Sequence, residues 1–410
     1  MGTVPAWVWP NAGMLVLVGV YLWWRLVIGT TSRRSAARRV GTVLAAIVTL
    51  LGPAALIAQY ALPIAAQRVL GWPGWLAYGF VIFLATATVL TEPVRIYWWR
   101  RRRRAHQQAD VEASSDQPSS AGGPASADQP PALERRLFLR RVLATGIGVS
   151  AVAVTGIAAR SAVGGPAVRD VRIIIAGLPA AAVGMRIALV SDLHLGSIST
   201  GAFCRSVVEL VNAQRPDLVL LIGDLTDGSV AQLGTDLRPL TDLRAAEGVF
   251  FVTGNHEFYF DPDGWLDFIP RLGIRVLANE GVPVRGMWLA GVHDIAGRPS
   301  GRGPDMDAAL AGRGDGQPVI MMSHSPNLVY DAVDRDVELM VSGHTHGGQF
   351  YPAALLVGAT VPVLSGLRSF GSTQAFVTNG AGFWGPIARL GAPPDITIAE
   401  LQPPGFPHAG

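Results

Sequence analysis

The chain has 410 residues, half of them hydrophobic, and a positive mean hydropathy of +0.33, which excludes one ordinary soluble domain. All 33 basic residues are arginine; residues 1–141 carry 16 of them against 6 acidic residues, whereas residues 142–410 carry 17 against 24. The pI of about 9.3 therefore describes the first third of the chain. The acidic remainder has no basic stripe of the kind that binds nucleic acid.

Three apolar segments in the first hundred residues are each long enough to cross a bilayer, which takes about 20 residues. Tryptophan pairs lie near the segment ends, as interfacial aromatic residues do. A buried core helix is the alternative for any one segment, but three in series favour a three-helix transmembrane region over residues 1–99. The three segments lie near Val8–Val27, Val40–Ala61 and Gly74–Leu90.

The placement of arginine predicts the orientation of these spans. Four arginines follow the first span, and Arg95 and the run Arg100–Arg104 follow the third, whereas the loop after the second holds only Arg68. By the positive-inside rule, the first and third connections are cytoplasmic and the amino terminus lies outside. The arginine run could instead bind nucleic acid, but its position beside Trp98 and Trp99 at a span end favours a topological role.

Residues 100–134 are expected to form a basic and then disordered cytoplasmic linker. From about His106 to Ala132 the sequence consists largely of Ser, Ala, Gln, Pro, Gly and Asp, with almost no large apolar residue. Such a composition cannot bury a core. We therefore expect no packed structure between the third span and the next apolar segment.

Residues 135–160 resemble a twin-arginine export signal. Arg135-Arg136-Leu-Phe138-Leu139 is followed by Val142–Ala159, which carries no charge. The pattern departs from the usual one because Glu134 stands where Ser or Thr is common, and because it begins far into the chain. A fourth transmembrane helix is the alternative, and both interpretations place everything after Ala159 outside. No clear cleavage site follows, so we expect the segment to be retained as an anchor.

Residues 165–404 alternate between short apolar runs, typical of buried strands, and helical periodicity such as that of Gly201–Gln214. Five of the apolar runs are Ile187–Val190, Leu218–Ile222, Val249–Val252, Val319–Met322 and Leu339–Val341. These five runs indicate one sheet with one edge of ligands. Later runs at Trp288–Gly291, Ala375–Thr378 and Ile396–Leu401 are expected to complete a second sheet. The pattern predicts a two-sheet α/β sandwich with helices outside.

A short motif follows each of the five apolar runs directly. In order, the motifs are Asp192-Leu-His194, Gly223-Asp224, Gly254-Asn255-His256-Glu257, Ser323-His324 and Gly343-His344-Thr-His346. The carboxyl ends of strands in an open α/β sheet are where ligands bind. Five of the eight histidines in the chain fall in these motifs. Carboxylates, imidazoles and an amide at one edge suit divalent ions such as Mn²⁺, Fe²⁺ or Zn²⁺.

This ordered set resembles the calcineurin-like metallophosphoesterase superfamily, whose pattern is D-x-H, G-D, G-N-H-[ED], H and G-H-x-H. The resemblance covers roughly Val171 to Gln402. Gly343–Gln349 (GHTHGGQ) and the later GFWGP and LGAPPD segments are similar to the membrane-associated YkuE/YaeI-type branch. The resemblance implies a four-layer α/β/β/α sandwich, here preceded by an α-helical transmembrane region.

The resemblance also implies a site with two divalent metal ions, Mn, Fe or Zn. One ion would be held by Asp192, His194, Asp224 and His346. The other would be held by Asp224, Asn255, His324 and His344. In that family a metal-activated hydroxide attacks phosphorus, and the residue matching His256 protonates or stabilises the leaving oxygen. Asp224, Asn255 and His256 are therefore the expected catalytic residues, and Glu257 fits a structural role better than a catalytic one.

The sequence thus predicts a multi-pass cell-membrane protein with an extracytoplasmic, metal-dependent phosphoesterase domain, a phosphodiesterase or pyrophosphatase rather than a phosphomonoesterase. Membrane tethering favours a lipid-linked phosphate ester as substrate, and residues 135–160 would engage the twin-arginine export machinery. The alternative is a non-catalytic envelope binding protein that retains the fold, although such a protein has no physical need for every ligand. A transporter is disfavoured because Arg25 is the only charge inside the spans.

Overall fold

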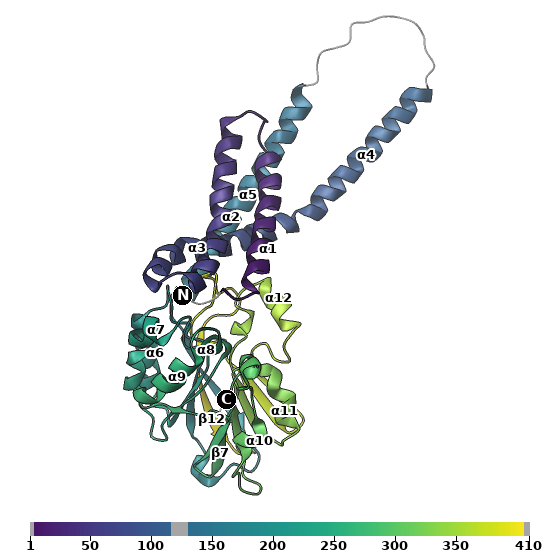
Figure 1. Cartoon of the computed structure of the whole chain (residues 1–410). Helices are drawn as coiled ribbons and strands as arrows, with labels where there is room; N and C mark the ends of the chain where they lie inside the picture. The colour runs from purple at the N-terminus through teal and green to yellow at the C-terminus, as the bar shows by residue number, and fades with distance from the viewer. Residues whose placement is uncertain (1–3, 116–129, 406–410) are drawn as a thin grey trace, which may run out of the picture. The chain divides into compact units, whose positions relative to one another are not determined.

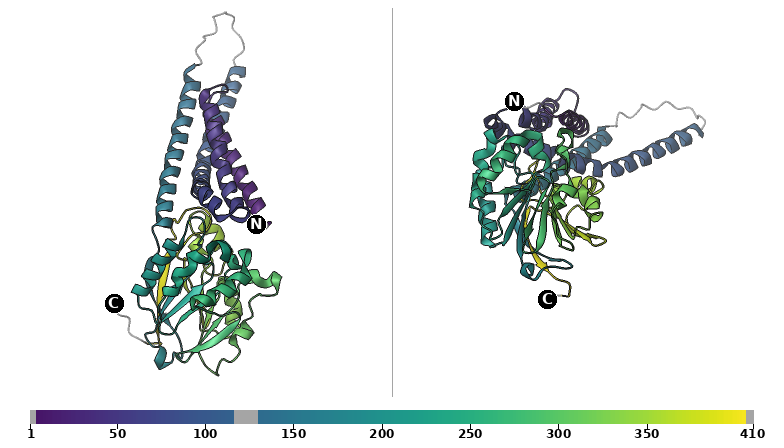
Figure 2. Two further views of the ribbon diagram at one scale, coloured as in Figure 1. Left: turned by 60° about the vertical axis from the view of Figure 1, so that its left-hand side comes forward. Right: turned by 60° about the horizontal axis from the view of Figure 1, so that its bottom comes forward.

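The computed structural model describes residues 4–115 and 130–405 (Figures 1 and 2). The chain divides into two compact units. The helical unit comprises Trp9–Pro53 and Ala77–Gly156. The sheet unit comprises Met1–Val8, Ala54–Leu76 and Ile157–Gly410, so it includes the end of one apolar helix and the start of the next.

Four helices in the described part of the chain are long and apolar enough to cross a membrane. They correspond to the three predicted spans and to the predicted fourth segment. Their apolar stretches are Val8–Ile28, Ala36–Ala61, Ile64–Trp98 and Leu137–Val163. The helices themselves are α1 (Val8–Leu22, continued by the π-helical turn η1 at Trp23–Ile28), α2 (Ala36–Ala61), α3 (Ile64–Leu90) and α5 (Pro130–Val163). Helix α3 begins at Ile64, whereas the predicted third span began at Gly74. The helix continues through Pro73, which does not interrupt it.

The one charge inside the predicted spans is paired within the helical unit. Arg25 forms an ion pair with Glu92, which also pairs with Arg95 at 3.3 Å and accepts a hydrogen bond from the Tyr21 hydroxyl at 2.9 Å. A charge within an apolar span is tolerated when it is paired in this way. Arg25 therefore does not depend on reaching the membrane surface by itself.

The predicted linker is partly helical, which corrects the expectation of disorder. Helix α4 (Glu92–Ser115) continues past the arginine run, and α5 begins at Pro130. The stretch from Ala105 to Ser115 contains Ala, Gln and Glu, which favour helices, and neither Gly nor Pro. Residues 116–129, the rest of the predicted linker, lie outside the described residues.

The sheet unit contains two six-stranded sheets within the described ranges. The first has the order β1-β12-β2-β3-β4-β5, with bounds Ala167–Ile174, Asp395–Gln402, Arg186–Val190, Leu218–Ile222, Val249–Val252 and Arg275–Val276. The second has the order β10-β11-β9-β8-β7-β6, with bounds Gly366–Phe370, Thr373–Val377, Leu339–Ser342, Val319–Met322, Met287–Gly291 and Glu280–Val284. Both have parallel centres: β2-β3-β4 in one, and β7-β8-β9-β11 in the other.

Helices cover the outer face of each sheet, and an apolar core fills the space between the sheets (Figures 1 and 2). That core includes Leu189, Leu220, Leu289 and Met322. The first sheet is covered by α6 (Gly201–Ala213), α7 (Val230–Leu237) and α9 (Pro262–Phe268). The second is covered by α10 (Met306–Leu310) and α11 (Val329–Val333). This arrangement confirms the predicted four-layer α/β/β/α class; the remaining short helices are α8 (Asn255–Phe260) and α12 (Ala353–Gly358).

Two sequence-based assignments of strands to sheets were wrong. The five motif-bearing strands divide between the sheets, with β2, β3 and β4 in the first and β8 and β9 in the second. Strand β12 lies in the first sheet, where it pairs parallel to β1 and antiparallel to β2. An apolar run predicts burial but does not specify which strand it pairs with, since pairing is decided by tertiary neighbours.

Candidate metal centre

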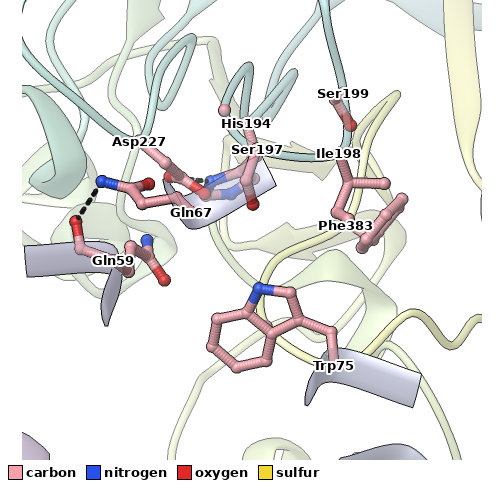
Figure 3. Close-up of a pocket in the computed structure, with 11 residues that line it drawn as sticks. Gln59, Gln67, Trp75, His194, Ser197, Ile198, Ser199, Asp227 and Phe383 are labelled. Atoms are coloured by element: carbon pink, nitrogen blue, oxygen red, sulfur yellow. Dashed lines mark hydrogen bonds and ion pairs between the residues drawn. The ribbon is translucent and has the colours of Figure 1, made fainter. Parts of the chain in front are cut away.

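The motif residues lie at one end of the sheet unit, beside a cavity whose lining includes His194, Ser197, Asp227 and Phe383 (Figure 3). The two sheets meet there through backbone and side-chain bonds. The amide of His344, after β9, donates to the Asp192 carboxylate at 3.1 Å. The amide of Asp192 in turn donates to the Gly223 carbonyl at 3.1 Å. Division of the strands between two sheets therefore still leaves their motifs side by side.

Five of the predicted ligands have left-handed backbone. The φ angles are 57° at Asp192, 45° at His194, 53° at Asp224, 70° at His344 and 52° at His346. Residues with a Cβ rarely adopt this conformation, which costs on the order of 1–3 kcal/mol each. Such strain persists where the surrounding structure requires a side chain to point in one direction. Its concentration at the strand ends marks this edge as a functional site.

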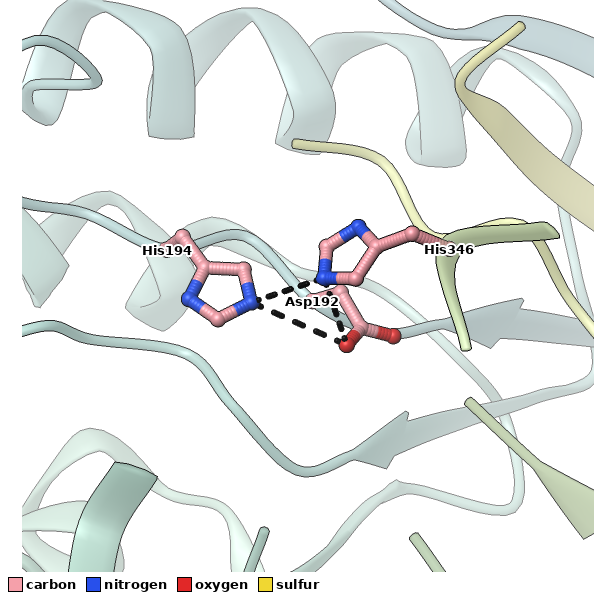
Figure 4. A group of neighbouring side chains, drawn as sticks. All are labelled: Asp192, His194 and His346. Atoms are coloured by element: carbon pink, nitrogen blue, oxygen red, sulfur yellow. Dashed lines mark hydrogen bonds and ion pairs between the residues drawn. The ribbon is translucent and has the colours of Figure 1, made fainter. Parts of the chain in front are cut away.

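The first ligand cluster comprises Asp192, His194 and His346 (Figure 4). One ligand atom from each lies within 4.8 Å of the others. His346 Nε2 is 3.0 Å from His194 Nε2 and 3.3 Å from Asp192 Oδ1, and all three side chains are buried. Two imidazole nitrogens and a carboxylate oxygen converge here on one point, as metal ligands do.

The second cluster comprises Asp224, His324 and His344, again with one ligand atom from each within 4.8 Å of the others. His324 Nε2 lies 3.1 Å from Asp224 Oδ2. His324 Nδ1 lies 2.7 Å from the Ile222 carbonyl oxygen, to which it donates in the corresponding tautomer. That bond leaves Nε2 as the free ligand atom, the arrangement by which proteins orient metal-binding histidines.

Asp224 reaches both clusters. Its Oδ2 is 3.1 Å from His324 Nε2 and 3.8 Å from His194 Nε2. Its Oδ1 accepts a hydrogen bond from the His256 amide at 2.8 Å. A carboxylate in this position can contact two neighbouring cations.

Whether these residues fit a metal ion can be judged from buried polar atoms that lack a hydrogen-bond partner among the described residues. Asp192 Oδ1, Asn255 Oδ1 and His324 Nε2 are buried and make no hydrogen bond with the described residues. Leaving such an atom unsatisfied costs about 1–3 kcal/mol. All three can act as ligand atoms, and a pair of divalent cations would satisfy them together. The donor set therefore fits the group that the sequence implies.

Asp227 is a residue of the site that the sequence analysis missed. One of its carboxylate oxygens lies 2.8 Å from His194 Nδ1 and 2.7 Å from His256 Nδ1. Burial opposes ionisation, but the two imidazoles hold the pKa of Asp227 at about 2. Burial likewise opposes protonation of His194, but Asp227 and Asp192 raise its pKa to about 10. Asp227 follows Asp224 by three positions on the same loop, and this proximity alone does not distinguish it from an ordinary loop acid.

We expect Asp227→Asn to weaken divalent-metal binding by roughly 10–100-fold, because the side chain that orients His194 loses its charge. The measurement is competition of the full-length protein in detergent against a fluorescent chelator. Asp267→Asn, on the exposed face of α9, is the matched control. Equal metal affinity in the two variants would show that Asp227 does not orient the ligand.

Arg389 was also missed, and it is fully enclosed, with 1% of its surface exposed. Its guanidinium donates to backbone carbonyls on the loops that carry and flank His346. Those carbonyls belong to His346, Asn379, Gly380, Gly382 and Ala392. Burial lowers the pKa of Arg389 to about 10, so it stays charged at neutral pH.

His346 differs from the other predicted ligands because its contacts place a proton on the nitrogen that would face a cation. Arg389 Nη2 lies 2.9 Å from His346 Nδ1, and a guanidinium can only donate. A neutral His346 in this contact therefore carries its proton on Nε2, the atom nearest the first cluster. Burial and the Arg389 charge together hold the pKa of His346 well below its usual value. The ring is neutral, and a cation at Nε2 would have to displace that proton.

The other motif residues have local roles. Glu257 accepts hydrogen bonds from the amides of Asp224, Leu225 and Gly254 at 2.7–3.0 Å. Burial and the nearby Asp224 charge raise the pKa of Glu257 to about 7. These backbone contacts are structural. Gln349 Nε2 donates to the Trp384 carbonyl at 2.9 Å and so ties two loops together.

His293 and Asp294, which follow strand β7, have local contacts. His293 Nδ1 lies 3.1 Å from the Thr253 hydroxyl. Asp294 caps the turn η5 (Ile295–Ser300) through the amide of Ala296 at 2.8 Å. Neither belongs to a ligand cluster among the described residues.

The chain is similar to known proteins that are all described as phosphoesterases or metallophosphoesterases. Residues 185–348 match the family model described as Calcineurin-like phosphoesterase. An uncharacterized metallophosphoesterase of Helicobacter pylori (strain ATCC 700392 / 26695) is 38% identical over 222 residues, which cover 53% of this chain and 60% of that protein. A Danio rerio transmembrane protein with metallophosphoesterase domain is 34% identical over 251 residues, covering 58% of this chain and 57% of that protein. A Campylobacter jejuni relative, an uncharacterized metallophosphoesterase, is 32% identical over 271 residues, covering 65% of this chain and 71% of that protein.

Proposed function

Since the chain belongs to the calcineurin-like metallophosphoesterase family, we propose that it is a membrane-anchored, dinuclear metal-dependent phosphoesterase that hydrolyses phosphodiester or pyrophosphate bonds. The observation that carries the proposal is the contact of Asp224 with both ligand clusters. The metal ligands in this proposal are Asp192, His194, Asp224, Asn255, His324, His344 and His346.

Two divalent ions in such a site supply an activated water and charge neutralisation for phosphoryl transfer. His256 acts as the general acid. Its Nδ1 faces the Asp227 carboxylate, which leaves Nε2 to carry the proton that the leaving oxygen requires. Asn255 supplies a neutral oxygen, which limits the negative charge of the site and favours an anionic substrate.

The proposed topology is multi-pass, with the sheet unit outside the cytoplasm. Four helices of spanning length and the arginines after the first and third spans support it. A carboxyl-terminal alkaline phosphatase fusion should be active, and a fusion after Arg104 inactive. We further propose that residues 135–160 use the twin-arginine route, in which case replacing Arg135 and Arg136 by lysine together should block export.

The proposed substrate is a phosphate ester carried by a lipid or another envelope component, cleaved at a diester or pyrophosphate bond. Its support is the membrane anchor, because a tethered enzyme meets molecules held at the same surface. A resemblance to the YkuE/YaeI-type branch favours diesters over monoesters.

The test uses the full-length protein purified in detergent and loaded with Mn²⁺, Zn²⁺ or Fe²⁺. We expect about two metal equivalents per chain and hydrolysis of bis(p-nitrophenyl) phosphate that a chelator abolishes. Folded protein that binds metal but turns over no phosphate ester would point to the non-catalytic binding protein. Folded protein that binds no divalent metal would overturn the phosphoesterase proposal and likewise favour the non-catalytic binding protein.

A further inference from the structure

The turn between the second and third apolar helices packs on the sheet unit. This hairpin, residues 54–76, lies in the same compact unit as the two sheets. The Tyr60 ring stacks on Phe260 of α8 with ring centres 5.1 Å apart and planes 3° from parallel. Arg68 pairs with Asp236 of α7 at 3.1 Å. The hairpin thus contacts the helix that begins with Asn255 and His256.

The same hairpin forms one wall of the cavity beside the metal ligands. Gln59, Gln67 and Trp75 line it from the hairpin, and His194 and Asp227 line it from the sheets (Figure 3). The cavity is small, with room for about one or two waters. The space is narrow, so an oxyanion beside His194 would lie within contact distance of the hairpin.

Aromatic rings from the hairpin and from the sheet unit surround His256, next to the cavity-lining residues Gln59 and Phe383 in the sequence. Tyr60 contacts Trp7 at 5.9 Å and Phe260 at 5.1 Å between ring centres. His256 contacts Phe260 at 6.0 Å and Trp384 at 5.6 Å, and Trp384 contacts Trp7 at 5.8 Å. The five rings form a closed circuit that includes the proposed general acid.

Three hydrogen-bond donors, one from the cavity lining and two from the aromatic circuit, find no partner within residues 4–115 and 130–405. Gln59 Nε2, the Tyr60 hydroxyl and Trp384 Nε1 are buried and make no hydrogen bond with the described residues. The neighbouring Gln67 differs, because its amide donates to the Gln59 and Leu62 carbonyls at 3.0 and 2.8 Å. Tyr60 is only 7% exposed. A buried donor without an acceptor is destabilising, so these three call for an acceptor other than those offered by the described part of the chain.

We propose that Gln59, Tyr60 and Trp384 donate hydrogen bonds to the phosphate oxygens of the substrate, so that the membrane hairpin completes the substrate-binding site. This inference rests on the proposed function. A phosphate ester is rich in acceptors and carries no donor on its non-bridging oxygens, which matches three unpaired donors. The donors are neutral, so they add binding and orientation without opposing the charge balance of the metal ligands.

The test is Tyr60→Phe in the full-length, metal-loaded protein in lipid nanodiscs, because phenylalanine keeps the ring stacked on Phe260 and removes only the hydroxyl. We expect the KM for bis(p-nitrophenyl) phosphate to rise about tenfold, with a smaller change in kcat. Calorimetric titration with inorganic phosphate, the hydrolysis product, should show a similar loss of affinity. Tyr330→Phe is the control, since Tyr330 lies on α11 and is 61% exposed.

Gln59→Leu is the second variant and should raise KM in the same direction. A lowered melting temperature with unchanged phosphate affinity in both variants would assign these residues a structural role and overturn the inference. Wild-type kinetics in both variants would overturn it as well. Failure of the wild-type protein to turn over any ester would count instead against the proposed function.

Discussion

Replacing Asp224 by asparagine is expected to lower kcat/KM for a phosphodiester by roughly 10³-fold, the scale seen when an electrostatic group at a reacting centre is lost. Asp224 contacts His324 of the second cluster at 3.1 Å and His194 of the first at 3.8 Å. Asparagine offers one neutral oxygen in place of two that share a negative charge. It cannot hold two cations next to each other.

The same variant should keep the local backbone, because the amide oxygen of asparagine can still accept the bond that His256 N donates to Asp224 Oδ1 at 2.8 Å. Steady-state kinetics and elemental analysis of the full-length protein measure the two effects. We expect metal content to fall together with activity while circular dichroism stays unchanged. Asp267→Asn, remote from the ligands, is the control. Full turnover with two bound metals in Asp224→Asn would rule out the bridging role.

The strands and the ligand-bearing motifs could be predicted because both are local features of the sequence. The apolar run Leu218–Ile222 predicts a buried strand regardless of which strands lie beside it, and the motif Gly223-Asp224 follows it directly. The partner of a strand is not local. Strand β12 was assigned to the wrong sheet because its apolar pattern is the same whether it pairs with β1 and β2 or elsewhere.

The residues that support the ligands could not be predicted either, because their partners are also far away in the sequence. Asp227 looks like any loop acid until the fold brings His194 and His256 to it. Arg389 lies well beyond the last ligand in sequence and is defined by the carbonyls that surround it. Gln59 and Tyr60 were counted as part of the second transmembrane span, whereas the hairpin places them beside the candidate site.

Replacing Arg389 by methionine is expected to destabilise the sheet unit by about 3–5 kcal/mol, the scale of breaking a buried charged network. Methionine has similar length but no donors, so the buried carbonyls of Asn379 and Gly382 would lose the hydrogen bonds that Arg389 donates to them. Urea unfolding of the full-length protein in detergent, followed by tryptophan fluorescence, measures the loss. Arg205→Met, on the exposed face of α6, is the control.

Arg389→Lys separates the charge of Arg389 from its geometry. Lysine retains a positive charge, but one ammonium group cannot reach carbonyls on both sides of a planar guanidinium. We therefore expect lysine to recover only part of the stability lost in Arg389→Met. If Arg389→Met unfolds within about 0.5 kcal/mol of the Arg205→Met control, the loops do not depend on the guanidinium. The position of His346 would then have to be fixed by the strained backbone at φ 52° and by its packing.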